Sequence, residues 1–178
     1  MKKLTSLFLV AIACSCNNAE KNAKDETQEP PAAATAATAM NYPYTIKNPD
    51  NWEIGSPANT MNVLKCLKAW EEGKVDESLQ YFGDSVTVKF DGIDKTMSND
   101  SLKAFFSAGR NSYKTVVVKM EDWESVVSKD KSEEWVTLWY TQTWETLKGV
   151  KDSVAVINDL KMKDGKIIRI DEYNRKLH

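Results

Sequence analysis

Few side chains in this sequence could carry acid–base or nucleophilic chemistry, and most catalytic patterns are missing. The only histidine is His178, the last residue of the chain, so we expect neither a histidine-based triad nor a histidine metal site. The sequence has no glycine-rich phosphate loop, no paired-cysteine motif and no G-x-S-x-G. Carboxylate chemistry remains, because a buried Asp or Glu with a raised pKa can exchange protons near neutral pH.

Two polar side chains fall on apolar faces of predicted strands. Asn158 is the polar member of a face that it shares with Val154, Val156, Leu160 and Met162. A buried amide needs hydrogen-bond partners, so Asn158 is either satisfied by backbone or by Tyr140, or it anchors a ligand. Glu172 shares a face with Ile168 and Ile170 and is a weak catalytic candidate. We favour the interpretation that it marks where the strand leaves the core. Alternation places Asp159 and Asp171 in solvent.

Cys66 and Trp70 belong to a predicted helix. Ser56 can cap this helix, Pro57 suits its first position, and Gly73 ends it. The spacing i, i+3, i+4 and i+7 makes one apolar stripe of Val63, Cys66, Leu67 and Trp70. We interpret Cys66 as a small core side chain, because no neighbour in sequence would lower the pKa of its thiol. Trp70 and the other tryptophans are typical of a core, and stacking on a ligand is the alternative.

The remaining pattern predicts two more helices and a run of strands. A short helix is expected at 75–82, and a third helix begins at Ser98 or Asn99 and is stopped by Gly109. Period-two alternation predicts strands at 86–90, 96–97, 113–127 (bent near Asp122), 134–147, 150–162 and 167–173. Asp164-Gly165 is typical of a tight hairpin turn. Helices first and antiparallel strands last indicate an α+β fold with helices against one face of a curved sheet.

Several phrases, in this order, resemble the SnoaL-like, ketosteroid-isomerase-like branch of the nuclear transport factor 2-like superfamily. They are the stop at Gly73 followed by Val75-Asp76, the run Tyr81-Phe82-Gly83-Asp84-Ser85-Val86, and the hairpin Asp164-Gly165-Lys166-Ile167-Ile168. The resemblance implies a cone-shaped, strongly curved antiparallel sheet wrapped around about three N-terminal helices, with a pocket at the wide end. It also implies dimers formed through the outer face of the sheet.

The resemblance places the steroid-isomerase roles on unsuitable residues. The oxyanion-binding tyrosine falls on Cys66, the general-base aspartate falls on Phe90 with Asp91 one residue later, and the buried acid falls on Asn158. Phe90 cannot accept a proton, and a thiol is a weak donor. We therefore expect no steroid-isomerase chemistry, and we take Cys66, Trp70, Phe90, Tyr140 and Asn158 as the candidate ligand pocket.

The N-terminus predicts export. Lys2 and Lys3 precede a short apolar run at 4–13, and Ala13-Cys14-Ser15-Cys16 resembles a bacterial lipobox. We expect a lipoprotein signal peptide at 1–15, acylation of Cys16 (Cys14 is the alternative), and a flexible tether at 16–41. The domain would span 42–178, beginning with an irregular arm at 44–54 that is anchored by Tyr44 and Trp52.

These observations narrow the function to a few classes. The net charge is −2 and no basic stripe is present, so we expect no nucleic-acid partner, and no motif predicts a cofactor or a metal. The strand at 134–147 is apolar on both sides, which suggests that a second copy of the chain or the N-terminal arm covers its outer face; the alternative is a tryptophan exposed on the surface without a partner. We expect a membrane-anchored, non-catalytic module at the cell envelope that binds a small apolar molecule or a protein. The alternatives are a carboxylate-based isomerase or dehydratase, and an assembly protein that docks through its sheet.

Overall fold

The computed structural model describes residues 42–45 and 51–177 of the chain. The domain described below lies within the unit Thr45–His178. Its elements are β1 (Trp52–Ile54), α1 (Pro57–Glu71), α2 (Val75–Leu79), β2 (Phe82–Phe90), β3 (Ile93–Ser98), α3 (Asn99–Asn111), β4 (Tyr113–Ser128), β5 (Glu134–Thr146), β6 (Lys151–Lys163) and β7 (Lys166–Lys176). The expected signal peptide, Cys14, Cys16, the whole expected tether at 16–41 and His178 lie outside the described residues.

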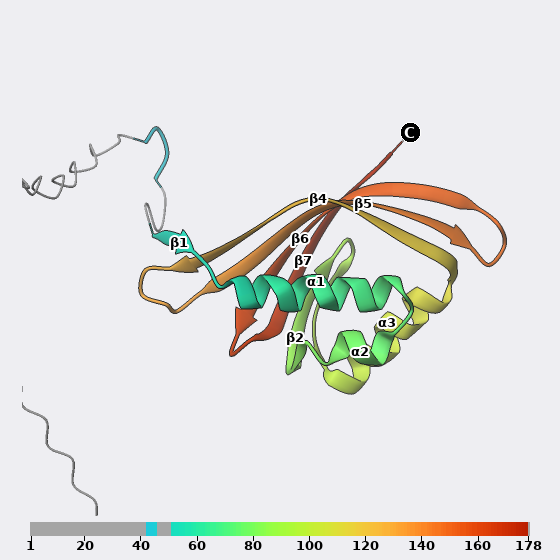
Figure 1. Ribbon diagram of the computed structural model, residues 1–178, viewed down its shortest axis with the longest axis horizontal. Coiled ribbons are helices and arrows are strands. Elements are labelled where there is room, and N and C mark those ends of the chain that lie inside the picture. Colours follow the sequence, from blue (N-terminus) through green and yellow to red (C-terminus); the bar gives the residue numbers. More distant parts are fainter. Residues whose placement is uncertain (1–41, 46–50, 178) are drawn as a thin grey trace, which may run out of the picture. The chain divides into compact units, whose positions relative to one another are not determined.

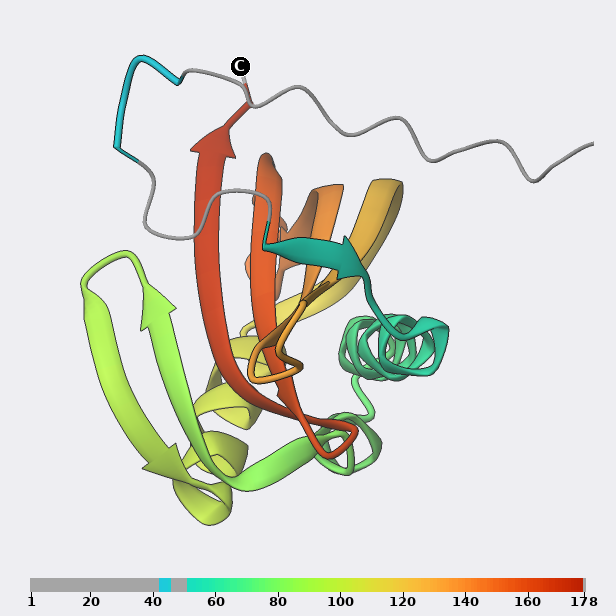
Figure 2. The same cartoon turned by 90° about the vertical axis from the view of Figure 1, so that its left-hand side faces the viewer.

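The strands form one seven-stranded sheet in the order β1-β4-β5-β6-β7-β2-β3. Every neighbouring pair is antiparallel except β2 and β7, which run parallel. The long strands bend over α1, which lies beneath them with α2 and α3 (Figure 1). In the second view, the β2–β3 hairpin stands opposite α1, so the sheet wraps around an interior (Figure 2). The expected α+β fold with a strongly curved sheet is confirmed, with this one parallel pair added to the expected antiparallel pattern.

Helix α1 forms as its sequence predicts. The Ser56 side chain accepts a hydrogen bond from the Asn59 backbone N–H, and Pro57 occupies the start of the helix. Val63 and Cys66 are buried against the sheet. Gly73 follows the helix with a φ of 79°, a left-handed conformation that other residues adopt at a cost.

Two predicted helix ends are wrong. The helix expected at 75–82 ends at Leu79, and Phe82 begins β2 instead. Gly109 does not stop α3, which continues to Asn111. The helix continues through Gly109 because the next residue, Arg110, is held by hydrogen bonds from its side chain to carbonyls of α1 and β4. The start of α3 is settled by the Ser98 side chain, which accepts from the Ser101 N–H.

The strand pattern is confirmed together with its irregularities. The pairing of β4 with β5 shifts between Met120 and Asp122, where the bend was predicted. Asp164 and Gly165 both have positive φ, 51° and 76°, as a two-residue hairpin turn between β6 and β7 requires. The pairing of β6 with β7 also shifts, between Lys161 and Met162, and this shift changes which side chains of β7 point into the interior.

The expected irregular arm at 44–54 is wrong where it reaches the sheet. Trp52–Ile54 is the strand β1, which pairs with the end of β4. Trp52 is 43% exposed, so its side chain is not a buried anchor, whereas Tyr44 belongs to the separate unit Met1–Tyr44. Among the described residues, no helix has the length and apolar content needed to cross a bilayer.

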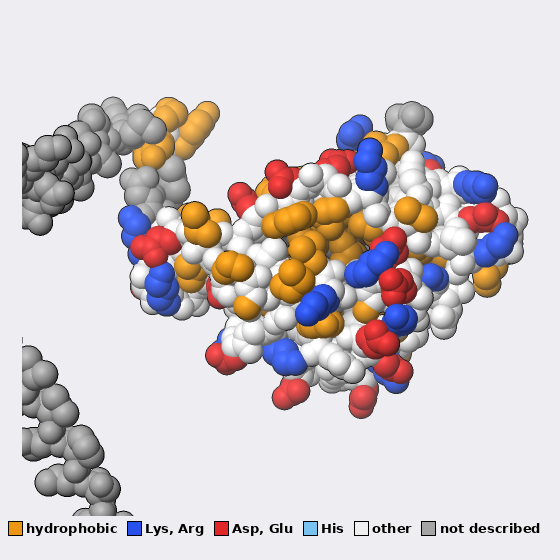
Figure 3. Space-filling model, in the orientation of Figure 1, with side chains coloured by type: hydrophobic (Ala, Val, Ile, Leu, Met, Phe, Trp, Pro, Cys, Tyr) orange, Lys and Arg blue, Asp and Glu red, His pale blue; other side chains and the backbone are white. Residues whose placement is uncertain are grey.

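Apolar side chains also gather on the surface between α1 and the strand β4 (Figure 3). Exposed Met61 and Trp123 line a groove there with Leu64. The outer face of the sheet carries a second row, Trp139, Ile157 and Tyr173, in register across β5, β6 and β7. Ile157 is 40% exposed and Tyr173 is 63% exposed, so the outer face is apolar in the centre.

The prediction that Asp159 and Asp171 lie in solvent is wrong. Both belong to the outer face, as alternation requires, but Asp171 is only 8% exposed and Asp159 is half-buried. Asp171 accepts from the Arg169 guanidinium at 2.7 Å, and Asp159 accepts from the Thr137 hydroxyl at 2.8 Å. Burial raises the pKa of Asp159, and the bond from Thr137 opposes that shift. Neighbouring side chains on a wide sheet therefore shield polar groups that single-strand alternation assigns to water.

Candidate functional site

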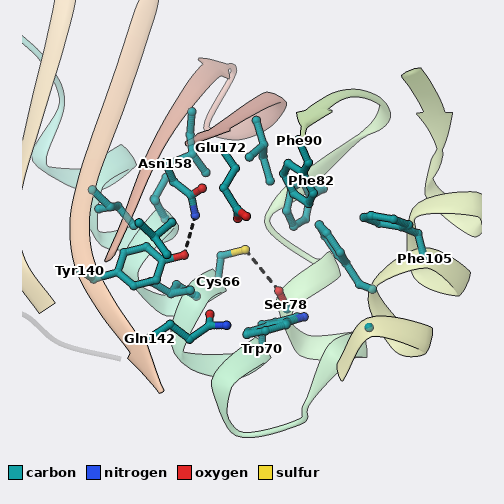
Figure 4. A pocket seen from close by; sticks show the side chains of 18 of the residues that line it. Cys66, Trp70, Ser78, Phe82, Phe90, Phe105, Tyr140, Gln142, Asn158 and Glu172 are labelled. Atoms are coloured by element: carbon teal, nitrogen blue, oxygen red, sulfur yellow. Dashed lines mark hydrogen bonds between the residues drawn. The ribbon is translucent and has the colours of Figure 1, made fainter. Parts of the chain in front are cut away.

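A cavity of about 400 Å³ lies between the helices and the concave face of the sheet. Its lining comes from α1 (Val63, Cys66, Leu67, Trp70), α2 (Ser78), β2 (Phe82, Phe90), α3 (Phe105, Phe106, Ala108, Gly109), β4 (Tyr113), β5 (Leu138, Tyr140, Gln142), β6 (Val154, Val156, Asn158, Leu160) and β7 (Ile170, Glu172). The volume suits a small organic molecule. Figure 4 shows the polar side chains directed into a space with aromatic walls.

The structure brings the sequence-predicted pocket residues together. Cys66, Trp70, Phe90, Tyr140 and Asn158 all line this one cavity, although they come from α1, β2, β5 and β6. Their convergence follows from the fold, because the stripe of α1 faces the inward positions of the central strands. Asp91, the neighbour of Phe90, is exposed and lies outside the cavity, so no carboxylate replaces the missing base at this position.

Asn158 and Tyr140 form a buried polar pair on adjacent strands. The Asn158 Nδ2 donates a hydrogen bond to the Tyr140 hydroxyl at 2.8 Å. The amide nitrogen is therefore satisfied by Tyr140, which was one of the partners expected from the sequence. The Asn158 Oδ1 is buried and has no hydrogen-bond partner among the described residues. The residue is only 8% exposed. An unpaired buried carbonyl is uncommon and costs about 1–3 kcal/mol, so this oxygen is an exception among the buried polar groups of the domain.

Glu172 also lines the cavity, directly across from Asn158 in the β6–β7 register. Burial raises the pKa of its carboxyl, while a 3.4 Å hydrogen bond from the Asn174 side chain opposes that shift. The interpretation that Glu172 marks the end of the core is therefore incomplete. Tyr173 is exposed, but Glu172 itself projects inward (Figure 4). The predicted partner Ile168 is not among the lining residues, because the shift in β7 puts Ile167 inside instead.

The cysteine of the cavity wall is a core residue rather than a nucleophile. Cys66 is 6% exposed, and its Sγ lies 3.3 Å from the Ser78 hydroxyl. Burial raises the pKa of the thiol to about 12, so the reactive thiolate is scarce at neutral pH. Burial also raises the pKa of Tyr140, and the nearby Glu172 carboxyl adds to that effect.

Sequence reasoning missed the aromatic wall formed by β2 and α3. Phe82, Phe106, Phe105 and Phe90 form a chain of tilted ring contacts with centroid separations of 5.5, 5.7 and 5.9 Å. The pattern assigned Phe105 and Phe106 only to an apolar helix stripe, which does not reveal a lined cavity. Gln142 was also missed, although it shares the inward parity of Tyr140 on β5.

The rim of the cavity lies at the C-terminal end of α3, where Ala108 and Gly109 are exposed. The next residue, Arg110, joins this end to α1 and β4. Its guanidinium donates to the carbonyls of Trp70 (3.1 Å), Glu71 (3.0 Å) and Tyr113 (3.2 Å). Arg110 therefore fixes the rim relative to two cavity-lining residues, Trp70 and Tyr113.

Within the described part of the chain, no group of three or more His, Cys, Asp or Glu side chains could hold a metal ion. The lining of the cavity includes one carboxylate and no Lys, Arg or His. Its chemistry is therefore that of an apolar and aromatic container with three hydroxyls (Ser78, Tyr113 and Tyr140), two amides and a largely buried acid.

Comparison with solved structures identifies the fold. A cystatin-fold protein of Novosphingobium aromaticivorans matches with a TM-score of 0.56 at 13% identity, over 66% of this chain and 99% of that protein. An NTF2-like protein of Burkholderia pseudomallei matches with a TM-score of 0.56 at 12% identity, over 67% of this chain and 92% of that protein. An LEH-like epoxide hydrolase of M. tuberculosis matches with a TM-score of 0.54 at 14% identity, over 66% and 83%. No protein-family model and no curated protein matches the sequence.

These likenesses confirm the nuclear transport factor 2-like, cystatin-like fold that the sequence predicted. At 12–14% identity they establish the fold and not the activity, because one fold carries many unrelated functions.

Proposed function

We propose that this nuclear transport factor 2-like domain binds a small, largely apolar molecule inside its cone without chemically changing it, as a lipid-anchored module at the cell envelope. The anchoring part of the proposal rests on the N-terminal sequence, with Cys16 as the acylated residue. The binding part rests on the cavity and on the side chains that line it.

One observation carries the proposal: the unpaired Asn158 Oδ1 in the wall of a cavity of about 400 Å³. Tyr140 uses its oxygen to accept from Asn158, which leaves its own O–H free to donate. A ligand that pairs with these groups removes the cost of an unsatisfied buried oxygen, and its apolar body replaces water along the aromatic walls.

The positions that perform steroid isomerisation in the resembling proteins argue against that chemistry here. Cys66 is a buried, protonated thiol bonded to Ser78, and Phe90 contributes a ring edge to the wall. Neither group can accept a proton from carbon at neutral pH. The cavity therefore supports recognition better than it supports proton transfer between two fixed groups.

A carboxylate-based enzyme is the second candidate, and Glu172 is the observation that favours it. A largely buried acid with a raised pKa inside a cavity is a common feature of catalytic sites. The likeness to an LEH-like epoxide hydrolase shows that this fold can hold an enzyme. In this cavity, however, Glu172 has no second titratable group with a pKa near neutrality beside it.

Native mass spectrometry of the full-length protein, purified with its anchor from its own cells, tests the proposal. We expect a mass in excess of the acylated chain that leaves on collisional activation. Val156→Trp, which fills the cavity, should abolish that excess mass, whereas Val117→Trp on the 55% exposed side of β4 should keep it. Retention of the ligand by a folded Val156→Trp variant would contradict binding in the cavity, and a product differing from the retained molecule would favour the enzyme.

A further inference from the structure

The charge inside the cavity has one sign. Glu172 is the lining residue that is ordinarily charged, and no Lys, Arg or His lines the same space. Two cations, Lys89 and Arg169, lie in a separate groove on the other side of Glu172. Both are already engaged, Lys89 with Asp94 at 3.0 Å and Arg169 with Asp171 at 2.7 Å. Glu172 therefore has no cationic partner among the described residues.

A charged carboxylate in this largely buried position favours a neutralising partner. A buried charge without a partner is costly, and the bond from Asn174 at 3.4 Å is too long to offset much of that cost. Either the carboxyl takes up a proton, or a cation enters the cavity with the ligand.

The polar groups beside Glu172 distinguish between these two outcomes. The unpaired Asn158 Oδ1 and the Glu172 carboxylate belong to residues paired in register on β6 and β7. Both are acceptors, so the ligand that satisfies them together must bring more than one N–H or O–H. An ammonium group carries three such hydrogens and no acceptor, whereas a ketone, ether or ester carries none.

The aromatic side chains beside Glu172 suit the same group. Phe82 and Phe90 lie next to Glu172, on the neighbouring strand β2, and Trp70 lies in the same cavity near Ser78 (Figure 4). Aromatic faces attract a cation by about 0.5–2 kcal/mol, most strongly when water is excluded. They also bury the apolar part of a ligand, so an acid, an unpaired carbonyl and aromatic rings act on one molecule.

We propose that the cavity selects a primary amine on an apolar, aromatic body, with its ammonium held between the Glu172 carboxylate and the Asn158 Oδ1. This inference rests on the proposed binding function and narrows its ligand class from apolar molecules to organic cations. No covalent step is involved.

Titration calorimetry of the full-length protein at neutral pH with tryptamine and with tryptophol tests the inference. The two probes share the indole ring and the two-carbon chain, and they differ by an ammonium against a hydroxyl. We expect tryptamine to bind about tenfold more tightly, which corresponds to about 1.4 kcal/mol.

Matched variants locate the source of that preference. Glu172→Gln keeps the shape and removes the charge, so it should weaken tryptamine about tenfold and leave tryptophol within about threefold. Glu124→Gln, on the exposed surface and outside the cavity, should change neither affinity. Asn158→Leu should weaken tryptamine more than it weakens tryptophol, because it removes the second acceptor.

Three results would overturn the inference. If tryptophol binds as tightly as tryptamine, the cavity takes neutral molecules, and the proposed binding function stands without the amine. If tryptamine is preferred equally by Glu172→Gln, the charge is recognised elsewhere. If neither probe binds, the amine and the binding function both fail.

Discussion

Arg110 holds together the end of the domain where the cavity opens, so its replacement is an informative perturbation. Its side chain donates to the carbonyls of Trp70, Glu71 and Tyr113, which belong to α1 and β4. The Glu71 carbonyl receives two of these bonds, at 3.0 and 3.3 Å, and it lies at the last residue of α1, where carbonyls lack an intrahelical donor. Arg110→Ala leaves this group without its protein partner.

The expected loss of unfolding free energy follows from the number and geometry of these hydrogen bonds. A hydrogen bond from a charged donor contributes about 1.5–3 kcal/mol, and a cation at a helix C-terminus adds about 0.3–1 kcal/mol. Arg110 is half-buried, and Gly73 also donates to the Trp70 carbonyl, so water and backbone recover part of the loss. We expect Arg110→Ala to lower the free energy of unfolding by about 2–3 kcal/mol, and Tm by about 8–12 °C.

Urea unfolding followed by tryptophan fluorescence measures this change, with two companion variants. Arg110→Lys keeps the charge but loses the planar fork, so it should lie between the wild type and Arg110→Ala. Lys103 lies on the same helix as Arg110, and Lys103→Ala removes an exposed ion pair with Asp76 of α2, which should cost less than about 0.5 kcal/mol. An Arg110→Ala value no larger than that of Lys103→Ala would refute the reasoning that these carbonyl bonds hold the rim.

Three further outcomes follow from the same structure. The Cys66 thiol, with its pKa raised to about 12 by burial, should resist a charged thiol reagent at pH 8 in the folded protein and react in denaturant, as peptide mapping of that residue would show. Glu172→Gln should become more stable relative to the wild type as pH rises. Burial raises the pKa of Glu172 in the folded protein, so the protonated carboxyl stabilises the wild type fully below the unfolded pKa of about 4.3. The wild type loses that stability as pH rises through the folded pKa, and the glutamine variant does not. A difference in urea midpoint that is equal at pH 4 and pH 7 would count against this. Gly165→Ala, at a φ of 76°, should cost about 1–2 kcal/mol in the same assay, and an unchanged midpoint would show that the turn relaxes.

The sequence predicted the order of the elements because each has a local signal of its own. Ser56 and Ser98 are helix caps in the structure, and Asp164-Gly165 forms the turn that its residue types favour. The errors occur where a distant partner decides the outcome. Trp52–Ile54 becomes a strand because the end of β4 offers a free edge, and α3 passes Gly109 because Arg110 finds acceptors on α1 and β4.

The candidate site was predictable to the extent that alternation survives along each strand. Tyr140 and Asn158 lie where the period of two places them, and their hydrogen bond follows from adjacent inward positions on β5 and β6. Phe105 and Phe106 could not be assigned to the cavity, because a helix stripe reveals a buried face without showing what lies opposite. The register shift between β6 and β7 moves Ile168 off its predicted face, and no pattern of residues in the sequence predicts that shift.

The position of Glu172 connects the fold to the function. Because Glu172 is paired with Asn158 in the β6–β7 register, the strand pairing that builds the concave face also places a carboxylate beside Asn158. A domain selected for stability alone would place an apolar side chain there, since an unpaired buried acid opposes folding. The Asn158 Oδ1 has no donor and Glu172 has no cationic partner within the described chain, although both residues line the same cavity. An ammonium from outside the chain would bring both the hydrogens and the charge, and this is the premise of the proposed amine site.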